Sequence, residues 1–165
     1  MKHWLWISLF ILVLDQATKW LILSTFEPNE TVVLFPNVTL TLAFNPGAAF
    51  SFLATAGGWQ RWLFAGLALV VTAVLVGWLL RLGRGERLHA LSLSLLIGGA
   101  VGNLIDRVLL GHVIDFIQVF IPAIPLAIFN PWPAFNVADS AITVGVLLLI
   151  GVTLAADEGR RRSTS

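Results

Sequence analysis

Residues 88–105 read LHALSLSLLIGGAVGNLI, and this apolar stretch decides the class of fold to be expected. It contains no Asp, Glu, Lys or Arg. A helix needs about 20 mostly apolar residues to cross a bilayer. Gly98 and Gly102 form a small-xxx-small pair, which lets neighbouring helices approach closely. We therefore predict a membrane-spanning helix here that packs tightly against others.

Three similar stretches accompany it, at residues 4–23, 62–80 and 137–156. The 165-residue chain is 58% hydrophobic and only 12% charged, whereas a soluble domain carries about 25% charged residues. Cysteine is absent, which excludes disulfides and thiolate chemistry. We predict a mainly α membrane protein, with residues 1–165 forming a single membrane-embedded domain of four transmembrane helices.

The basic residues predict the orientation of these helices. With four spans, seven of the ten Lys and Arg residues fall on one side, which the positive-inside rule makes the cytoplasm. Both termini are then cytoplasmic, and the segments 24–61 and 106–136 face outward. The first span contains an acid and a base and lacks an A-x-A cleavage site, so we interpret it as a retained helix. The seven residues are Lys2, Arg81, Arg84, Arg87, Arg160, Arg161 and Arg162.

The first outer segment carries a strand pattern. Residues 31–44 read TVVLFPNVTLTLAF, in which apolar residues and threonines alternate after position 37. Such alternation is typical of a half-buried strand, and Pro36-Asn37 is a turn signal. We expect a small β-sheet on the outer membrane surface, followed by a turn at Asn45-Pro46-Gly47.

The second outer segment is apolar but rich in proline. Residues 117–135 contain Pro122, Pro125, Pro131 and Pro133, a spacing that a regular helix does not carry. We expect a re-entrant or surface-lying loop here, suited to form a wall or lid for a lipid-bearing substrate.

Several charged residues lie inside or beside the spans, where each costs about 2.5–3.5 kcal/mol on insertion scales. Asp15 and Lys19 are spaced i, i+4 and share one helix face. They form either a structural ion pair or a pair in which Lys19 also faces the substrate. Asp106 is expected to pair with Arg107 or with Lys19. Asn103, one turn earlier, fixes a neighbouring carboxylate or bridges two helices.

Asp115 and Asp139 have no basic residue beside them in the sequence, apart from His112 near Asp115. Asn136 is placed to cap the fourth span, so Asp139 is either part of a helix cap or a catalytic acid. Two convergent carboxylates can hydrolyse a peptide bond, because one ionises to activate water while the other keeps its proton. We predict that Asp139 carries the resting charge, because the helix dipole favours a carboxylate there.

Two other chemistries remain open. A Ser140–Lys19 dyad would make the chain a membrane hydrolase of another type. The charged residues of the spans would alternatively serve a small proton-coupled transporter, although no inverted repeat is evident. The chain lacks H-E-x-x-H and its three histidines are dispersed, so no metal or other cofactor is expected.

Five motifs, in this order along nearly the whole chain, resemble the signature blocks of the bacterial lipoprotein signal peptidase family. They are Asp15-Gln16-Ala17-Thr18-Lys19, Asn45-Pro46-Gly47-Ala48-Ala49-Phe50, Gly98-Gly99-Ala100-Val101-Gly102-Asn103-Leu104-Ile105-Asp106-Arg107, Val113-Ile114-Asp115-Phe116 and Phe135-Asn136-Val137-Ala138-Asp139-Ser140.

The resemblance implies an aspartic endopeptidase of the bacterial plasma membrane, with four helices and an outward β-cradle. Such an enzyme cleaves diacylglyceryl-modified prolipoproteins just before the lipidated cysteine, and globomycin-type lipopeptides inhibit it. No nucleic acid is implied as a partner. The proline-rich stretch is longer than in the family's pattern, which bears on lid shape and substrate preference.

The resemblance also assigns roles to ten residues of this chain. Asp115 and Asp139 match the catalytic pair. The remaining eight match positions that line or support the site, or further polar positions of the family: Asn45, Gly47, Asn103, Arg107, Asn136, Asp15, Lys19 and Asp106.

Overall fold

The computed structural model describes residues 2–47, 57–123 and 130–163, with the backbone alone for 156–163. A short 3-10 turn, η1 (Lys2–Trp4), leads into the first of four long helices. Each of the four is long and apolar enough to cross a membrane, which confirms the predicted spans. The helices are α1 (Leu5–Thr25), α2 (Trp59–Arg81), α3 (Arg87–Leu109) and α4 (Val137–Ser163).

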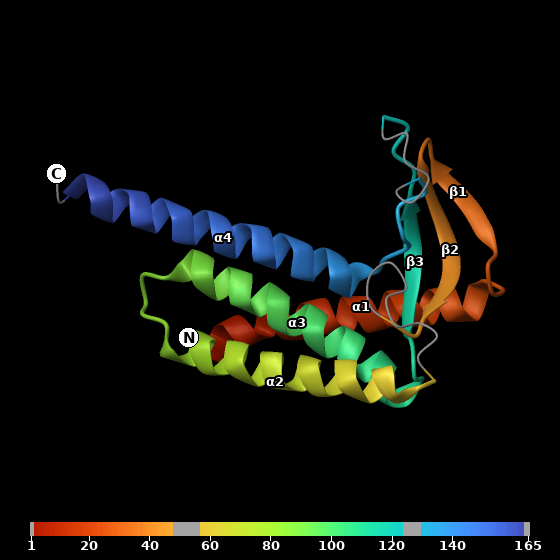
Figure 1. Ribbon diagram of the computed structural model, residues 1–165, viewed down its shortest axis with the longest axis horizontal. Coiled ribbons are helices and arrows are strands. Elements are labelled where there is room, and N and C mark those ends of the chain that lie inside the picture. The colour runs from red at the N-terminus through yellow and green to blue at the C-terminus, as the bar shows by residue number, and fades with distance from the viewer. Residues whose placement is uncertain (1, 48–56, 124–129, 164–165) are drawn as a thin grey trace.

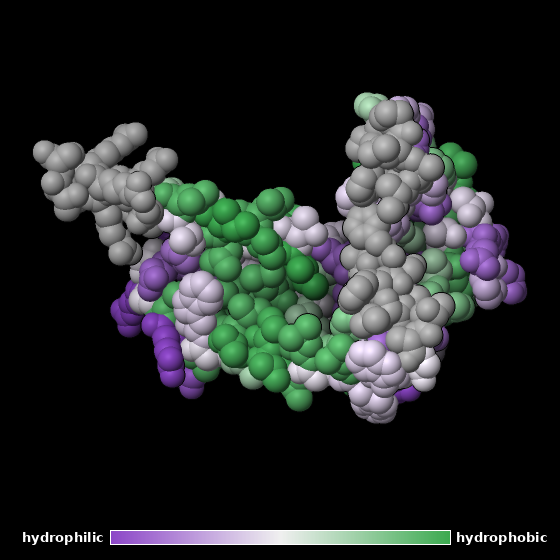
Figure 2. All heavy atoms as spheres, viewed as in Figure 1, coloured by the Kyte–Doolittle hydropathy of each residue, from purple (hydrophilic) through white to green (hydrophobic). Residues whose placement is uncertain are grey.

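The helices lie side by side, and all strands gather at one end of the bundle (Figure 1). The visible face of the bundle is apolar along the helices, whereas hydrophilic residues collect at its two ends (Figure 2). This distribution is what a bilayer requires of a multi-pass protein, because only the ends reach water.

Helix α3 is the centre of the bundle, and its glycines explain why. A Cβ atom at Gly98 would lie 2.7 Å from the Ser8 carbonyl oxygen of α1, and one at Gly102 would lie 2.6 Å from Asp15 Oδ2. Only glycine allows α1 to approach this closely. The small-xxx-small pair therefore acts as predicted.

Helix α3 carries two charged residues in its last turn. Asp106 and Arg107 lie there, and the helix continues to Leu109. Asp106 forms an ion pair with Lys19 of α1.

The strands form an antiparallel sheet in the order β1-β2-β3. Strands β1 (Thr31–Phe35) and β2 (Val38–Asn45) form the predicted hairpin, and Asn37 takes a positive φ of 68° in its turn.

Strand β3 (Val113–Val119) was not predicted, and residues 117–119 belong to it rather than to the proline-rich loop. Its apolar residues do not alternate, and the four residues from Val113 to Phe116 are all buried. Ile114 and Phe116 join Ile22 of α1 and Leu42 of β2 in one apolar cluster. This packing turns Asp115, between them, toward the opposite face of the sheet.

The described part of the proline-rich loop contains no helix and returns beside β3. The Trp132 amide donates to the Val119 carbonyl at 2.7 Å, and Phe135 forms a bridge with Ile117. Pro125 lies outside the described residues. The loop therefore closes one wall of the space in front of β3.

Candidate active site

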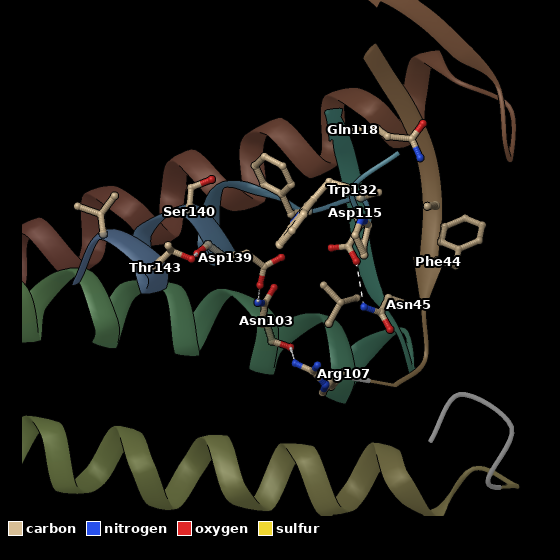
Figure 3. Close-up of a pocket in the computed structure, with 16 residues that line it drawn as sticks. Phe44, Asn45, Asn103, Arg107, Asp115, Gln118, Trp132, Asp139, Ser140 and Thr143 are labelled. Atoms are coloured by element: carbon tan, nitrogen blue, oxygen red, sulfur yellow. Dashed lines mark hydrogen bonds between the residues drawn. The ribbon is translucent and has the colours of Figure 1, made fainter. Parts of the chain in front are cut away.

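A cavity of about 810 Å³ opens where β3, the end of α3 and the start of α4 meet. Figure 3 shows the carboxylates of Asp115 and Asp139 directed into the same space, with the Trp132 ring beside them. Polar lining residues include Asn45, Asn103, Arg107, Asp115, Asp139 and Ser140.

Asp115 lies in β3 and is only 3% exposed. Its Oδ1 accepts a hydrogen bond from Asn136 Nδ2 at 2.8 Å, and its Oδ2 accepts one from Asn45 Nδ2 at 3.1 Å. Burial, and after it the negative charge of Asp139, together raise the pKa of Asp115 to about 7. The bond from Asn45 acts in the opposite direction. Asp115 therefore holds its proton up to a pH near 7, whereas an ordinary aspartate loses it near pH 4.

Asp139 lies in the first turn of α4 and shares hydrogen bonds with Asn136 in both directions. The Asp139 amide donates to Asn136 Oδ1 at 2.9 Å, and the Asn136 amide donates to Asp139 Oδ2 at 3.2 Å. This reciprocal arrangement is a capping box, so the predicted Asn136 cap is present. Asp139 Oδ1 accepts a further bond from Asn103 Nδ2 at 2.7 Å. Asp139 thus caps the helix and also lines the cavity.

Asn136 connects the two aspartates. Its side chain is fully buried, and its Nδ2 lies within 3.2 Å of Asp115 Oδ1, Asn103 Oδ1 and the Ile114 carbonyl. Because the same residue bonds to Asp139 through its backbone and its amide oxygen, it fixes both carboxyl groups relative to each other.

A second group of charges, the ion cluster of Asp15, Lys19 and Asp106, lies behind the cavity. Lys19 Nζ is 2.8 Å from Asp15 Oδ2 and 2.8 Å from Asp106 Oδ2. Asp106 therefore pairs with Lys19, as one of the two predicted alternatives proposed. Lys19 is 1% exposed and is not among the cavity-lining residues, so the structure favours an ion pair over a lysine that faces substrate.

The ion cluster is connected to the cavity by two contacts. Lys19 Nζ donates to Asn103 Oδ1 at 3.0 Å, which directs the Asn103 amide nitrogen toward Asp139. Asp15 Oδ1 accepts the backbone N–H of Ala138 at 2.9 Å. The ion cluster thus helps to fix the position of the first turn of α4.

Arg107 borders the cavity on the side of α2. Its guanidinium donates to the Gly47 carbonyl at 3.1 Å and to the Asn103 carbonyl at 3.3 Å, and it lies over the Phe64 ring. The Gly47 amide donates to Asn45 Oδ1 at 3.0 Å, which closes the predicted turn after β2. The rest of that motif, residues 48–50, lies outside the described residues.

Two residues that support the site were missed in the sequence. Gln16 Nε2 donates to Asp106 Oδ1 at 2.9 Å and to the Gly102 carbonyl at 3.2 Å. The sequence feature that could have indicated this role is an amide side chain next to Asp15 in an otherwise apolar span. Arg61 donates to the Val108 carbonyl at 2.6 Å and fastens the end of α3 to α2. Nothing in its local sequence marks that contact.

Ser140 also lines the cavity, but its hydroxyl donates to the Asn136 carbonyl at 2.9 Å. Among the described residues, no hydrogen bond joins Ser140 to Lys19, whose ammonium is already bound by three side chains. The geometry therefore gives a serine–lysine dyad no support.

Comparison with known proteins agrees with the family resemblance of the five sequence motifs. The family model described as Signal peptidase (SPase) II matches residues 7–155. Lipoprotein signal peptidase of Pseudomonas fluorescens (strain Pf0-1) is 55% identical over 149 residues, covering 88% of this chain and 84% of that protein. Its counterpart in Pseudomonas aeruginosa (strain UCBPP-PA14) is 52% identical over 149 residues, with the same two coverages.

Two solved structures described as bacterial membrane enzymes share the fold. The first has a TM-score of 0.84 and 31% identity, and the match covers 96% of this chain and 92% of that one. The second has a TM-score of 0.77 and 31% identity, with coverages of 93% and 94%.

Proposed function

The chain belongs to the signal peptidase II family, which makes it a membrane protease acting on prolipoprotein signal peptides, and we propose that Asp115 and Asp139 carry out its chemistry. One observation carries this proposal. Asn136 bonds to both carboxyl groups in the wall of a single cavity. Below, these two aspartates are called the dyad.

In the proposed mechanism the dyad shares one proton. We assign the proton to Asp115, whose raised pKa of about 7 lets it carry a proton up to neutral pH, and the ionised state to Asp139. Asp139 removes a proton from water as the water oxygen attacks the scissile carbonyl carbon. Asp115 donates a hydrogen bond to the carbonyl oxygen, on which negative charge develops. Asp139 then passes its proton to the amide nitrogen, and the carbon–nitrogen bond breaks.

Three features support the ionised state of Asp139. Two N–H groups, from Asn103 and Asn136, donate to its two oxygens. It lies in the first turn of α4, where the helix dipole favours negative charge. Lys19 orients the Asn103 amide that serves it. Asp115 also accepts two N–H bonds but lies in a strand, without a helix terminus behind it.

We further propose that the dyad works at the outer face of the bacterial plasma membrane, with both termini in the cytoplasm. The support is the distribution of Lys and Arg, which favours one side of the four spans. The scissile bond of a prolipoprotein carrying diacylglyceryl would then reach the cavity while its acyl chains stay in the bilayer. Globomycin-type lipopeptides are expected in the same cavity, and residues 1–165 act as one peptidase unit.

The experiment is cleavage of a diacylglyceryl-modified prolipoprotein by the purified protein in detergent. We expect mass spectrometry of the product to show cleavage immediately before the lipidated cysteine. The same prolipoprotein without diacylglyceryl serves as the control substrate and is expected to be cut far more slowly. Equal cleavage of both substrates would contradict the proposed lipid requirement, and no cleavage of either by folded protein would contradict the proposed function.

A further inference from the structure

The catalytic cavity does not end at the dyad but continues along one side of α4. Thr143 and Val144 line its inner end. Just beyond lies an open apolar groove of about 600 Å³, which we call the α4 groove. Val144 and Leu147 are three residues apart, which is a rise of only about 4.5 Å. The α4 groove is lined by Leu88 of α3 and by Leu147, Leu148, Gly151, Val152 and Ala155 of α4.

The cavity and the groove lie on the same side of the helix. Val144, Leu147, Gly151 and Ala155 follow one another at intervals of three and four residues, so they form one stripe along α4. Helix α4 begins near the sheet and runs away from it toward the opposite end of the bundle (Figure 1), so the stripe leads away from Asp139. The stripe therefore connects the lining of the cavity to the lining of the groove along one side of α4.

We infer that the α4 groove holds the apolar helix of the signal peptide while the dyad cuts the bond that follows it. This inference rests on the proposed function, because it takes Asp139 as the point at which the scissile bond lies. The apolar part of a signal peptide precedes its cleavage site and has its charged end on the cytoplasmic side. A path that leaves the dyad in the cytoplasmic direction is therefore the one this segment has to follow.

The dimensions and the chemistry of the groove fit this occupant. Asp139 and Ala155 are 16 positions apart, which spans about 24 Å along a helix. An apolar signal-peptide region of about 7–15 residues is about 10–22 Å long as a helix. All six lining residues of the groove are apolar or glycine, and Gly151 and Ala155 are small enough to let another helix approach closely.

Gly151 offers a way to fill the groove without disturbing the bundle. A Cβ atom at Gly151 meets no atom within 4 Å. Gly77 on α2 is a matched control, because its Cβ also meets nothing within 4 Å and it is not part of the groove. The two glycines also lie at the same distance from the end of a candidate membrane span. That span ends at Arg81 in α2, four residues after Gly77, and at Ala155 in α4, four residues after Gly151.

The first test is photo-crosslinking in the Asp139→Asn background, which holds substrate without turnover. A crosslinking amino acid is placed at Leu147 in the groove or at Val74 on α2, which are similarly exposed at 65% and 63%. We expect position 147 to crosslink the apolar region of a full-length prolipoprotein and position 74 not to. Crosslinks at 147 to membrane lipid alone, or equal substrate crosslinking at both positions, would overturn the inference.

The second test compares Gly151→Phe with Gly77→Phe on two substrates, a full-length prolipoprotein and a short lipidated peptide lacking the apolar region. We expect the ratio of kcat/KM for the long substrate to that for the short one to fall about fivefold in Gly151→Phe, mainly through KM, and to stay constant in Gly77→Phe. An unchanged ratio in Gly151→Phe, or an equal fall in both variants, would overturn the groove while leaving the dyad intact. Failure of the wild-type protein to cut either substrate would instead overturn the proposed function on which the inference rests.

Discussion

The ion cluster and the dyad both place carboxyl groups at the same end of the bundle, yet they are built in opposite ways. In the ion cluster, one ammonium lies 2.8 Å from each of two carboxylates, and all three side chains are at most 2% exposed. Neither dyad carboxyl forms a salt bridge within the described part of the chain, and both border a cavity. Their partners are neutral amides and backbone N–H groups.

This difference suits the ion cluster to stabilising the fold and the dyad to proton transfer. A carboxylate with its own counter-charge forms an ion pair, and here that pair holds α1 and α3 together. A buried carboxyl with only neutral donors has a proton that is easily exchanged near neutral pH, as the pKa of Asp115 indicates. Asn103 is the connection between the two regions, since it accepts from Lys19 and donates to Asp139.

The largest expected effect is on cleavage by the dyad. Asp115→Asn and Asp139→Asn each replace one carboxyl group of the dyad by an amide of the same shape. The amide cannot take part in sharing the proton. We expect the cleavage rate to fall by at least about a thousandfold in each variant, with the thermal unfolding midpoint in detergent within a few degrees of wild type. Glu27→Gln, at an exposed position, is the matched control and should change neither. A folded Asp139→Asn protein with near-normal cleavage would disprove the assignment.

The next largest effect is on stability in the ion cluster. Lys19→Met leaves Asp15 and Asp106 buried without their counter-charge, and breaking a buried pair typically costs about 3–5 kcal/mol. We expect a marked drop in the thermal unfolding midpoint in detergent. Lys2→Met, which removes an exposed lysine, is the control. If Lys19→Met unfolds at the wild-type temperature, the cluster does not have the stabilising role described here.

The fold and the site could be predicted from the sequence only in part. The four spans were predictable because apolar composition outweighs every other signal in a membrane helix. The β1–β2 hairpin was predictable from its threonine alternation, whereas β3 was not, because Val113–Val119 is nearly continuously apolar and shows no period. The pairing of Asp15 with Lys19 follows from i, i+4 spacing. The choice of Lys19 over Arg107 as partner of Asp106 depends on how closely α1 approaches Gly102, which spacing does not reveal.

Residues that act through long-range contacts were harder to foresee. Asn136 was predicted as a helix cap, and it is one, but its bond to Asp115 depends on where β3 lies. Gln16 and Arg61 act across 90 and 47 positions of the chain, at Asp106 and Val108. Such contacts depend on tertiary packing and leave no local pattern.

A third prediction concerns pH. Asp115 holds its proton below pH about 7 and loses it above. Because the dyad needs one proton, we expect the cleavage rate to fall about tenfold per pH unit above this point. Asn45 stabilises the ionised form of Asp115, so Asn45→Ala should move this limb of the profile to higher pH. Infrared spectra at pH 6 should show a protonated carboxyl band that Asp115→Asn abolishes and Asp139→Asn retains. A band lost only in Asp139→Asn would reverse the assignment of the proton.

The smallest expected effect is at Ser140, which lines the cavity next to Asp139. Ser140→Ala removes one hydroxyl bond to the Asn136 carbonyl, worth about 1 kcal/mol. We expect the rate of cleavage to change by less than about fivefold. A complete loss of cleavage in folded Ser140→Ala protein would instead favour a serine hydrolase.

The central claim is that Asp115 and Asp139 act as one unit, and single-turnover cleavage with excess enzyme tests it most directly. The rates of wild type, Asp115→Asn, Asp139→Asn and the double variant are measured on the same diacylglyceryl-modified prolipoprotein. If the two carboxyls share one proton, either substitution disables the pair, and the double variant is no more than about threefold slower than the slower single variant. Losses that multiply in the double variant, or a single variant that cleaves at nearly the wild-type rate, would contradict the dyad.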